Sequence, residues 1–393
     1  MGRAEPAVND IARQYSRFRV TERILLTGHS HQAWPDVALD GQLEAFEDAA
    51  LAVDDKWGRA FAKADSLRDT YRMWLQDPEA DIALGANTHD LVLRFLSALD
   101  LRDRPKLIST DGEFHTLRRQ LDRLAEEGVQ VVRVPADDPE TLAGRLASQV
   151  DDRTSAVLVS AVLFETSRIV PGLAGLADAC ARVGAELLVD AYHALGPVPV
   201  ELWGTGLENA WIVGGGYKYL QFGEGNCFLR LPAHAQQARP VITGWFSEFS
   251  ALTDAREPGK VAYGTGGDRF AGATYDTTSH YRAVRVAEFF AAWQLTPKNL
   301  RSLYQQQLRR LSTLFDDLDL PASVIDRDRS MPVEAYGGFL SLHSPRAGEL
   351  QRALAEHGVH TDSRGSRLRF GPAPYLTDDQ LAAGMAELRR ACR

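Results

Sequence analysis

The sequence predicts an α/β protein, with a large domain built on a mostly parallel sheet flanked by helices and a small C-terminal α+β domain. Three observations lead to this fold class. The chain has 393 residues, more than one hydrophobic core usually organises. Its middle part alternates short β-type runs with longer helical patterns. Beyond about Thr277 the pattern becomes helical and then mixed, which is typical of a second, smaller unit.

The alternation begins with a β-type run at 106–109, followed by a helical spacing of leucines within 116–127. The next helix, over 173–183, should end at Gly184, because glycine is a typical helix stop signal. The other runs predict strands over 129–134, 155–160, 186–189 and 211–213 and a helix over 139–149. In such sheets the functional groups gather at the carboxyl ends of the strands.

The C-terminal part departs from this alternation. A helical pattern covers 281–318 and is followed by a strand over 337–342, a helix over 350–357 and a strand over 368–370. We therefore expect a large domain over 56–280 and a small domain over 281–393. Residues 1–55 should pack on both.

Composition narrows the function classes. The formal net charge is -9 and no basic stretch stands out, so no nucleic-acid partner is expected. The longest apolar run, over 156–164, is too short for a membrane span. The three cysteines lack CxxC spacing and His29 and His31 have no further ligand cluster, so neither a disulfide framework nor a metal site is expected. A reducing, cytoplasmic setting fits best.

Lys218 follows an apolar strand and the glycine run 214–216. A lysine at a strand end with little side-chain bulk around it suits a Schiff-base amine, which must be partly desolvated to be nucleophilic near neutral pH. The alternative from this stretch alone is a surface lysine in a turn.

Asp190 closes the apolar strand 186–189 and is followed by His193. An acidic residue at such a position needs a partner, which can be a cationic cofactor ring or simply the next turn. The gap of 28 residues to Lys218 leaves room for one loop and one strand, so both groups can meet at neighbouring strand ends.

The segment 85–89 precedes an apolar helical face, with Asn87 or Thr88 as a natural N-cap. A turn of small residues at a helix N-terminus can bind a phosphate group. An ordinary capped helix remains the alternative.

Taken together, these motifs resemble the class V family of fold-type-I pyridoxal 5'-phosphate (PLP) enzymes, and within it they are most similar to kynureninases. The lysine motif 217–220, with glycines at 223 and 225, and the motif Asp190-x-x-His193-Ala194 carry the resemblance. It implies the fold-type-I PLP-dependent transferase architecture, with PLP held by Lys218 as a Schiff base. Asp190 would then keep the ring nitrogen protonated, which makes the ring an electron sink.

The resemblance implies further cofactor contacts. Phe114 would stack on the PLP ring, and Asn87 and Thr88 would bind the phosphate. His193 and Tyr217 would bond the phosphate or the ring oxygen.

Two more contacts to the phosphate are implied. Trp245 lies in a tripeptide, 244–246, that is identical to one in kynureninases. Thr274 lies in a stretch, 269–274, that resembles the class V segment reaching the phosphate from a neighbouring subunit. A homodimer with shared active sites is therefore expected.

On the substrate side, Arg369 matches the arginine that binds the substrate α-carboxylate, and Ser30 and His29 resemble the Gly-Asn-Ser segment near the substrate, with His29 replacing asparagine. Two aryl-pocket positions depart from the family. No Gly-His pair occurs in 58–61, and no asparagine occurs near Thr274. The substrate need therefore not be kynurenine.

The resemblance implies kynureninase-like hydrolytic or lyase cleavage of an amino-acid side chain through an external aldimine and an α-carbanion, with Lys218 as general base. Another class V activity on a modified amino acid, such as an aminotransferase, a C–S lyase or an epimerase, is the alternative. The loop 360–365 has no cysteine, which argues against a desulfurase. An idle binding protein would need neither Lys218 nor Asp190.

Overall fold

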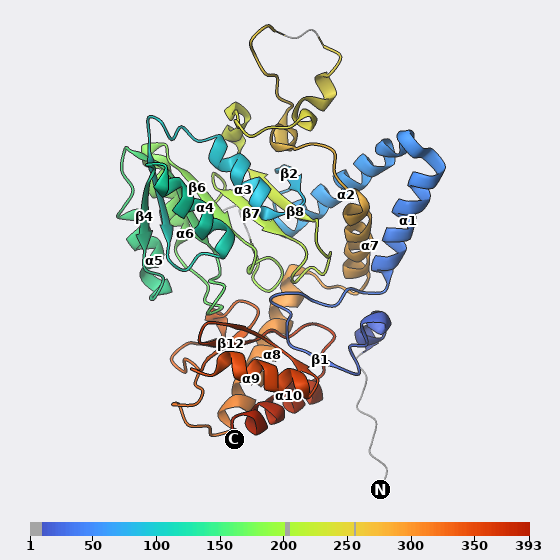
Figure 1. Ribbon diagram of the computed structural model, residues 1–393, viewed down its shortest axis with the longest axis vertical. Coiled ribbons are helices and arrows are strands. Elements are labelled where there is room, and N and C mark those ends of the chain that lie inside the picture. The colour runs from blue at the N-terminus through green and yellow to red at the C-terminus, as the bar shows by residue number, and fades with distance from the viewer. Residues whose placement is uncertain (1–9, 201–204, 255–256) are drawn as a thin grey trace.

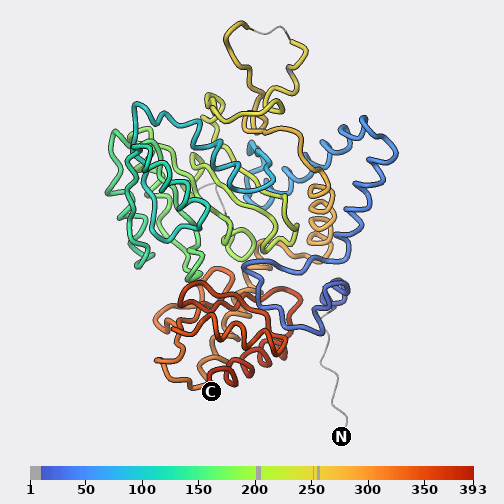
Figure 2. Tube along the Cα trace, in the orientation of Figure 1, coloured from blue at the N-terminus to red at the C-terminus, as the bar shows by residue number. Residues whose placement is uncertain are grey.

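The computed structural model describes residues 10–200, 205–254 and 257–393. Figure 1 shows a sheet flanked by helices in the upper part of the view and a smaller unit, coloured orange and red, below it. The tube in Figure 2 shows the N-terminal segment running between the two units. The predicted α/β fold class with a mostly parallel sheet is confirmed.

The large sheet has seven strands in the order β2-β8-β7-β6-β5-β3-β4. Only β8 runs antiparallel to its neighbours, β2 and β7. The strands are β2 (Asp81–Gly85), β3 (Lys106–Thr110), β4 (Gln130–Val134), β5 (Thr154–Ser160), β6 (Glu186–Asp190), β7 (Trp211–Gly215) and β8 (Cys227–Leu231). The order places β5, β6 and β7 side by side in the centre, so their carboxyl ends meet at one edge.

Side chains alternate between the two faces of the sheet and so contribute to two hydrophobic cores, one on each face. In β6, Leu187 and Val189 belong to one hydrophobic cluster, whereas Leu188 belongs to the other. The helices of this unit are α1 (Val37–Ala52), α2 (Trp57–Leu75), α3 (Thr88–Ser97), α4 (His115–Glu126), α5 (Pro139–Ala147), α6 (Leu173–Val183) and α7 (Thr278–Ala292). Helix α1 packs on α7 rather than on the sheet. Among the helices of the described residues, none is both long and apolar enough to cross a membrane.

The C-terminal unit holds a three-stranded antiparallel sheet of β9 (Leu340–His343), β11 (Asp362–Arg364) and β12 (Arg367–Phe370). Helices α8 (Pro297–Asp316), α9 (Ala347–Glu356) and α10 (Asp378–Ala391) complete it. The helical pattern predicted over 281–318 forms two helices, because Gln294 has a φ of 54° and Pro297 starts α8.

The N-terminal segment contacts both units. Strand β1 (Ile24–Leu25) pairs with β10 (Val359–His360) of the C-terminal unit. Tyr15 donates a 2.6 Å hydrogen bond to Gln221 of the large unit and packs against the ring of Tyr375, with 4.9 Å between ring centroids. The domain limits at 55/56 and 280/281 stay predictions.

Candidate active site

A cavity of about 440 Å³ lies at the carboxyl ends of β5, β6 and β7. This volume is in the range of small-molecule and cofactor sites. Apolar side chains from α3, α4 and the sheet line much of it, and a few polar groups converge on it. The structure brings seven of the predicted cofactor residues together here: Asn87, Thr88, Phe114, Asp190, His193, Tyr217 and Lys218.

Glycines allow the chain to carry Lys218 into this cavity. A Cβ at Gly215 would lie 2.4 Å from the Tyr192 hydroxyl, and a Cβ at Gly216 would lie 2.2 Å from the Phe222 ring. Neither position has room for a larger residue. The glycine run thus lets Tyr192 and Phe222 pack closely against the segment that leads to Lys218.

The Lys218 amine is buried among aromatic rings and neutral groups. Its Nζ lies 2.7 Å from His193 Nε2 and 4.9 Å from the centre of the Tyr192 ring. Burial lowers the pKa of Lys218 to about 7, although the negative charge of Asp190 opposes the shift. A large fraction of the amine is therefore unprotonated near neutral pH, as a nucleophile or base requires.

This pKa makes a testable prediction for cofactor uptake. For the Schiff base that the family resemblance implies at Lys218, the rate of covalent PLP uptake by the apoprotein should rise with pH and level off above about pH 7, because only the neutral amine attacks the aldehyde. Stopped-flow absorbance of the lysine-bound cofactor measures this rate. A rate that keeps rising toward pH 10, as for an ordinary lysine, would contradict the buried environment of Lys218.

Asp190 ends β6, the strand next to β7, which leads to Lys218. Its Oδ1 accepts a 2.7 Å hydrogen bond from the Tyr192 backbone amide. Burial raises the pKa of Asp190, while this hydrogen bond and the Lys218 charge lower it. Burial also lowers the pKa of His193, so its imidazole is neutral. His193 Nδ1 is buried and has no hydrogen-bond partner among the described residues.

Helix α3 points its N-terminus at the cavity. Asn87 is its N-cap, and its side chain accepts a 2.9 Å hydrogen bond from the Asp90 amide. Thr88 is the first helical residue and also lines the cavity. The remaining free amides of the first turn and the helix dipole favour an anion at this end.

Trp245 and Thr274 do not line this cavity. Trp245 is 45% exposed and packs on Phe246 and Phe249 in a 3-10 helix (Trp245–Ala251). Thr274 lines a larger cavity of about 950 Å³, which adjoins the first because Ala86, Glu224 and Gly225 line both. Within one chain, neither side chain reaches the seven residues above, and their contact to a phosphate stays a prediction.

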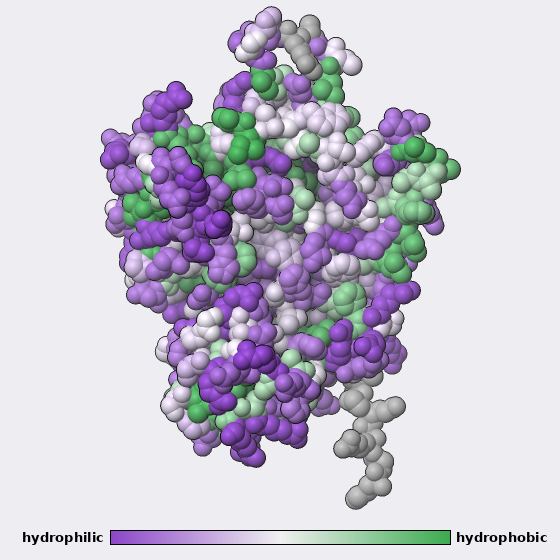
Figure 3. Space-filling model, viewed as in Figure 1, coloured by the Kyte–Doolittle hydropathy of each residue, from purple (hydrophilic) through white to green (hydrophobic). Residues whose placement is uncertain are grey.

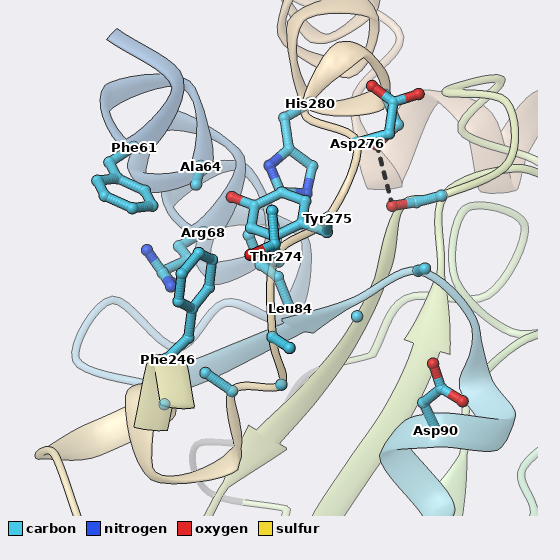
Figure 4. Close-up of a pocket in the computed structure, with 18 of the residues that line it drawn as sticks. Phe61, Ala64, Arg68, Leu84, Asp90, Phe246, Thr274, Tyr275, Asp276 and His280 are labelled. Atoms are coloured by element: carbon cyan, nitrogen blue, oxygen red, sulfur yellow. Dashed lines mark hydrogen bonds between the residues drawn. The ribbon is translucent and has the colours of Figure 1, made fainter. Parts of the chain in front are cut away.

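The larger cavity, drawn in Figure 4, brings together residues from the two segments in which the family motifs are not fully matched. Phe61 from α2 and the pair Thr274 and Tyr275 line the same space. Aromatic rings form one wall: Phe61 and Phe246 lie 6.0 Å apart between ring centroids, at 78°. Two segments that are far apart in the sequence thus line one cavity.

The predicted substrate residues Arg369 and His29 gather around Asp362. Arg369 is only 3% exposed, donates a 2.5 Å hydrogen bond to Asp362 and another to the Phe164 carbonyl, and has an unpartnered Nε among the described residues. His29 is fully buried, 4.5 Å from the Phe339 ring centroid, with Nε2 3.7 Å from Asp362. Since Phe164 lines the smaller cavity, this cluster lies directly behind its wall.

Ser30 lies apart from that cluster. Its hydroxyl is 3.1 Å from His31 Nδ1, and the His31 ring stacks on Tyr217 with 5.2 Å between centroids. Ser30 does not line the cavity, but it contacts His31, which stacks on the cavity residue Tyr217.

Several residues at the site were not predicted: Glu113, Ser160, Tyr192, Cys227 and Asp362. The role of Asp362 could not be predicted from the sequence, because it depends on the pairing of β11 with β12, which places Asp362 opposite Arg369. Cys227 belongs to the antiparallel strand β8, whose short apolar run is interrupted by Arg230. No group of three or more potential metal ligands occurs in the described parts of the chain.

Comparison with solved structures identifies the fold. A cysteine desulfurase from Thermococcus onnurineus matches with a TM-score of 0.80 at 14% identity, over 99% of both chains. A variant of C-DES with glycine covalently linked to its PLP cofactor matches with a TM-score of 0.81 at 17% identity, over 97% of this chain and 99% of that one. The chain therefore has the fold-type-I architecture of PLP enzymes.

Comparison of sequences shows which fold-type-I PLP enzymes the chain is similar to. The chain is 27% identical over 349 residues to a kynureninase of Burkholderia pseudomallei, covering 82% of this chain and 77% of that protein. It is 22% identical over 216 residues to an uncharacterised aminotransferase of Bacillus subtilis, covering 54% and 56%. No family model matches the chain. The similarities confirm the predicted resemblance to class V PLP enzymes close to kynureninase, and they support PLP as the cofactor.

Proposed function

We propose that this chain is a PLP-dependent enzyme that cleaves the side chain of an α-amino acid in a kynureninase-like hydrolytic or lyase reaction. The observation that carries the proposal is the meeting of three groups in one cavity. These are the Lys218 amine with its lowered pKa, the Asp190 carboxyl and the N-terminus of α3. They match the aldehyde, the ring nitrogen and the phosphate of PLP.

The other residues fit the same group. Phe114 would cover the ring, since its side chain lines the cavity and its ring centroid is 5.7 Å from Lys218 Nζ. Asn87 and Thr88 would hold the phosphate at the helix N-terminus. The unpartnered Nδ1 of His193 is a buried polar atom that a bound group can satisfy. Burial raises the pKa of Tyr217 to about 12, so its phenol stays protonated as a hydrogen-bond donor.

When bound, PLP supplies an electron-withdrawing ring that weakens bonds at the α-carbon of an attached amino acid. The chain provides the proton transfers and the positioning. Lys218 Nζ would act as the general base that removes the α-proton. Arg369 would bind the α-carboxylate through its unpartnered Nε, which requires the Phe164 wall that separates it from the cavity to move. Asp190 would hold its negative charge opposite the ring nitrogen.

The larger cavity supports a substrate other than kynurenine. The segment 58–61 lacks the Gly-His pair of the kynureninase motifs, and no asparagine occurs near Thr274. Phe61, Thr274 and Tyr275 of these two segments line that space. Another class V activity, such as an aminotransferase, a C–S lyase or an epimerase, therefore stays the alternative. Although the matched structures include a desulfurase, 360–365 contains no cysteine for such a reaction.

The proposal includes a homodimer with shared sites. Exposed apolar side chains support it: Figure 3 shows them gathered over α1, where Phe46 is 74% and Leu51 is 75% exposed. Val241, 82% exposed, and Trp245 form a second exposed apolar segment. Light scattering should give a mass of twice 43.3 kDa. A 43.3 kDa particle with full turnover would contradict shared sites.

The test of the function is to mix the PLP-loaded protein with L-kynurenine and assay for anthranilate and alanine, with Lys218→Ala as the control. Catalytic formation of both products supports kynureninase activity despite the changed wall. A protein that carries lysine-bound PLP but forms neither product would reject kynurenine and leave the cofactor assignment in place. Failure to bind PLP at all would reject the proposal.

A further inference from the structure

Glu113 is a buried carboxyl that the mechanism above does not use. It is 2% exposed and lies in the turn between β3 and α4, directly before Phe114. Its oxygens accept hydrogen bonds from the Thr110 hydroxyl at 2.8 Å, the Ser160 amide at 3.1 Å and the Ser160 hydroxyl at 2.5 Å. The carboxyl therefore fastens the Phe114 turn to the carboxyl ends of β3 and β5.

The same carboxyl lies behind Asp190. Ser160, which donates twice to Glu113, is the partner of Asp190 in the β5–β6 ladder. Burial raises the pKa of Glu113 to about 7, and the charge of Asp190 adds to the shift. Among other charged groups nearby, Lys218 faces Asp190 across the cavity, and Arg133 donates to the Thr110 carbonyl at 3.4 Å.

We propose that Glu113 is a positioning residue of the PLP site: its carboxyl clamps the Phe114 turn, and its ionised form adds a second negative charge behind Asp190. The inference rests on the proposed function. A protonated ring nitrogen held by Asp190 is a cation, and a second carboxylate behind it favours that cation. In return, the bound ring favours ionisation of Glu113, so PLP binding releases a proton from this side chain.

Glu113→Gln separates the clamp from the charge. The amide oxygen can still accept from Thr110 and the Ser160 amide, and the amide nitrogen can donate to the Ser160 hydroxyl. The substitution removes only the ability of this side chain to ionise. The readout is the ratio of the PLP dissociation constants of E113Q and wild type at pH 6 and at pH 8, measured by equilibrium fluorescence.

The expected result is that this ratio rises about threefold or more between the two pH values, because only the wild type gains the second charge. Thr110→Val is the matched control. Thr110 does not line the cavity, and the variant removes one hydrogen bond to the Glu113 carboxylate, which raises the pKa of Glu113 further. In a Thr110→Val background, the ratio of the two dissociation constants should therefore begin to rise at a higher pH. A ratio that does not change with pH would overturn the proposal.

Stability of the cofactor-free protein provides a second, independent readout. The folded state holds the Glu113 proton up to about pH 7, whereas the unfolded chain releases it at a lower pH. Wild-type stability should therefore fall relative to E113Q as pH rises from 5 toward 8. A stability difference that is the same at both pH values would reject Glu113 as the titrating group. Failure of the wild type to bind PLP would instead reject the proposed function.

Discussion

Lys218→Ala should remove the covalently bound cofactor and lower turnover by at least about 10⁴-fold, because one amine serves as both the attachment point and the general base. Visible absorbance of the purified protein and an assay with the accepted substrate measure the two effects. The size of the effect follows from the site: the amine contacts the neutral His193 imidazole at 2.7 Å and the Tyr192 ring at 4.9 Å, and neither group can replace a primary amine as attachment point.

Lys106→Met is the matched control for this prediction. Lys106 is also a buried lysine at a strand of the same sheet, but it pairs with Asp151 and does not line the cavity. The control should keep both the absorbance band and turnover. Full turnover in Lys218→Ala would contradict the mechanism.

Asp190→Asn should leave PLP attached to Lys218 but lower turnover by about 10²- to 10³-fold, the usual cost of losing one electrostatic contact to a developing charge. The amide is isosteric and its oxygen can still accept the hydrogen bond from the Tyr192 amide, so the loop should keep its shape. The measurement is kcat per bound PLP, with the bound PLP determined from the absorbance of the cofactor band in the same preparation.

The stability of this variant distinguishes an electrostatic role from a structural one. Since burial raises the pKa of Asp190, an uncharged amide should not destabilise the cofactor-free protein. Unchanged kcat in Asp190→Asn would show that the carboxylate is not the partner of the ring nitrogen.

Local patterns predicted the elements around the site well. The helix expected over 173–183 matches α6, and Gly184 ends it with a φ of 67°. Asn87 caps α3 as expected, and Lys218 and Asp190 meet at adjacent strand ends. Hydrophobic periodicity, caps and glycine stops depend only on neighbouring residues, so they can be read from the sequence.

Features that depend on distant partners were missed. The buried strand β8 contains Arg230, which donates to Asp77, 153 residues away. A charged residue in a strand argues against burial unless its partner is known. The pairing of Asp362 with Arg369 likewise requires the register of β11 and β12.

The predicted roles of Trp245 and Thr274 cannot be checked within a single chain. Both come from the resemblance to class V enzymes, in which this part of the chain approaches a phosphate. In the single chain, Thr274 faces the larger cavity and Trp245 is largely exposed. A second subunit would have to complete the contact.

The most direct test of the central claim is to load the protein with PLP, reduce it with borohydride, and locate the cofactor by mass spectrometry of peptides. The structure predicts one modified peptide, containing Lys218, with the modification on that residue. The unmodified Lys106 peptide provides the internal control, because Lys106 is equally buried but lies outside the cavity. Modification at another lysine, or no modification, would contradict the assignment of this cavity as a PLP site.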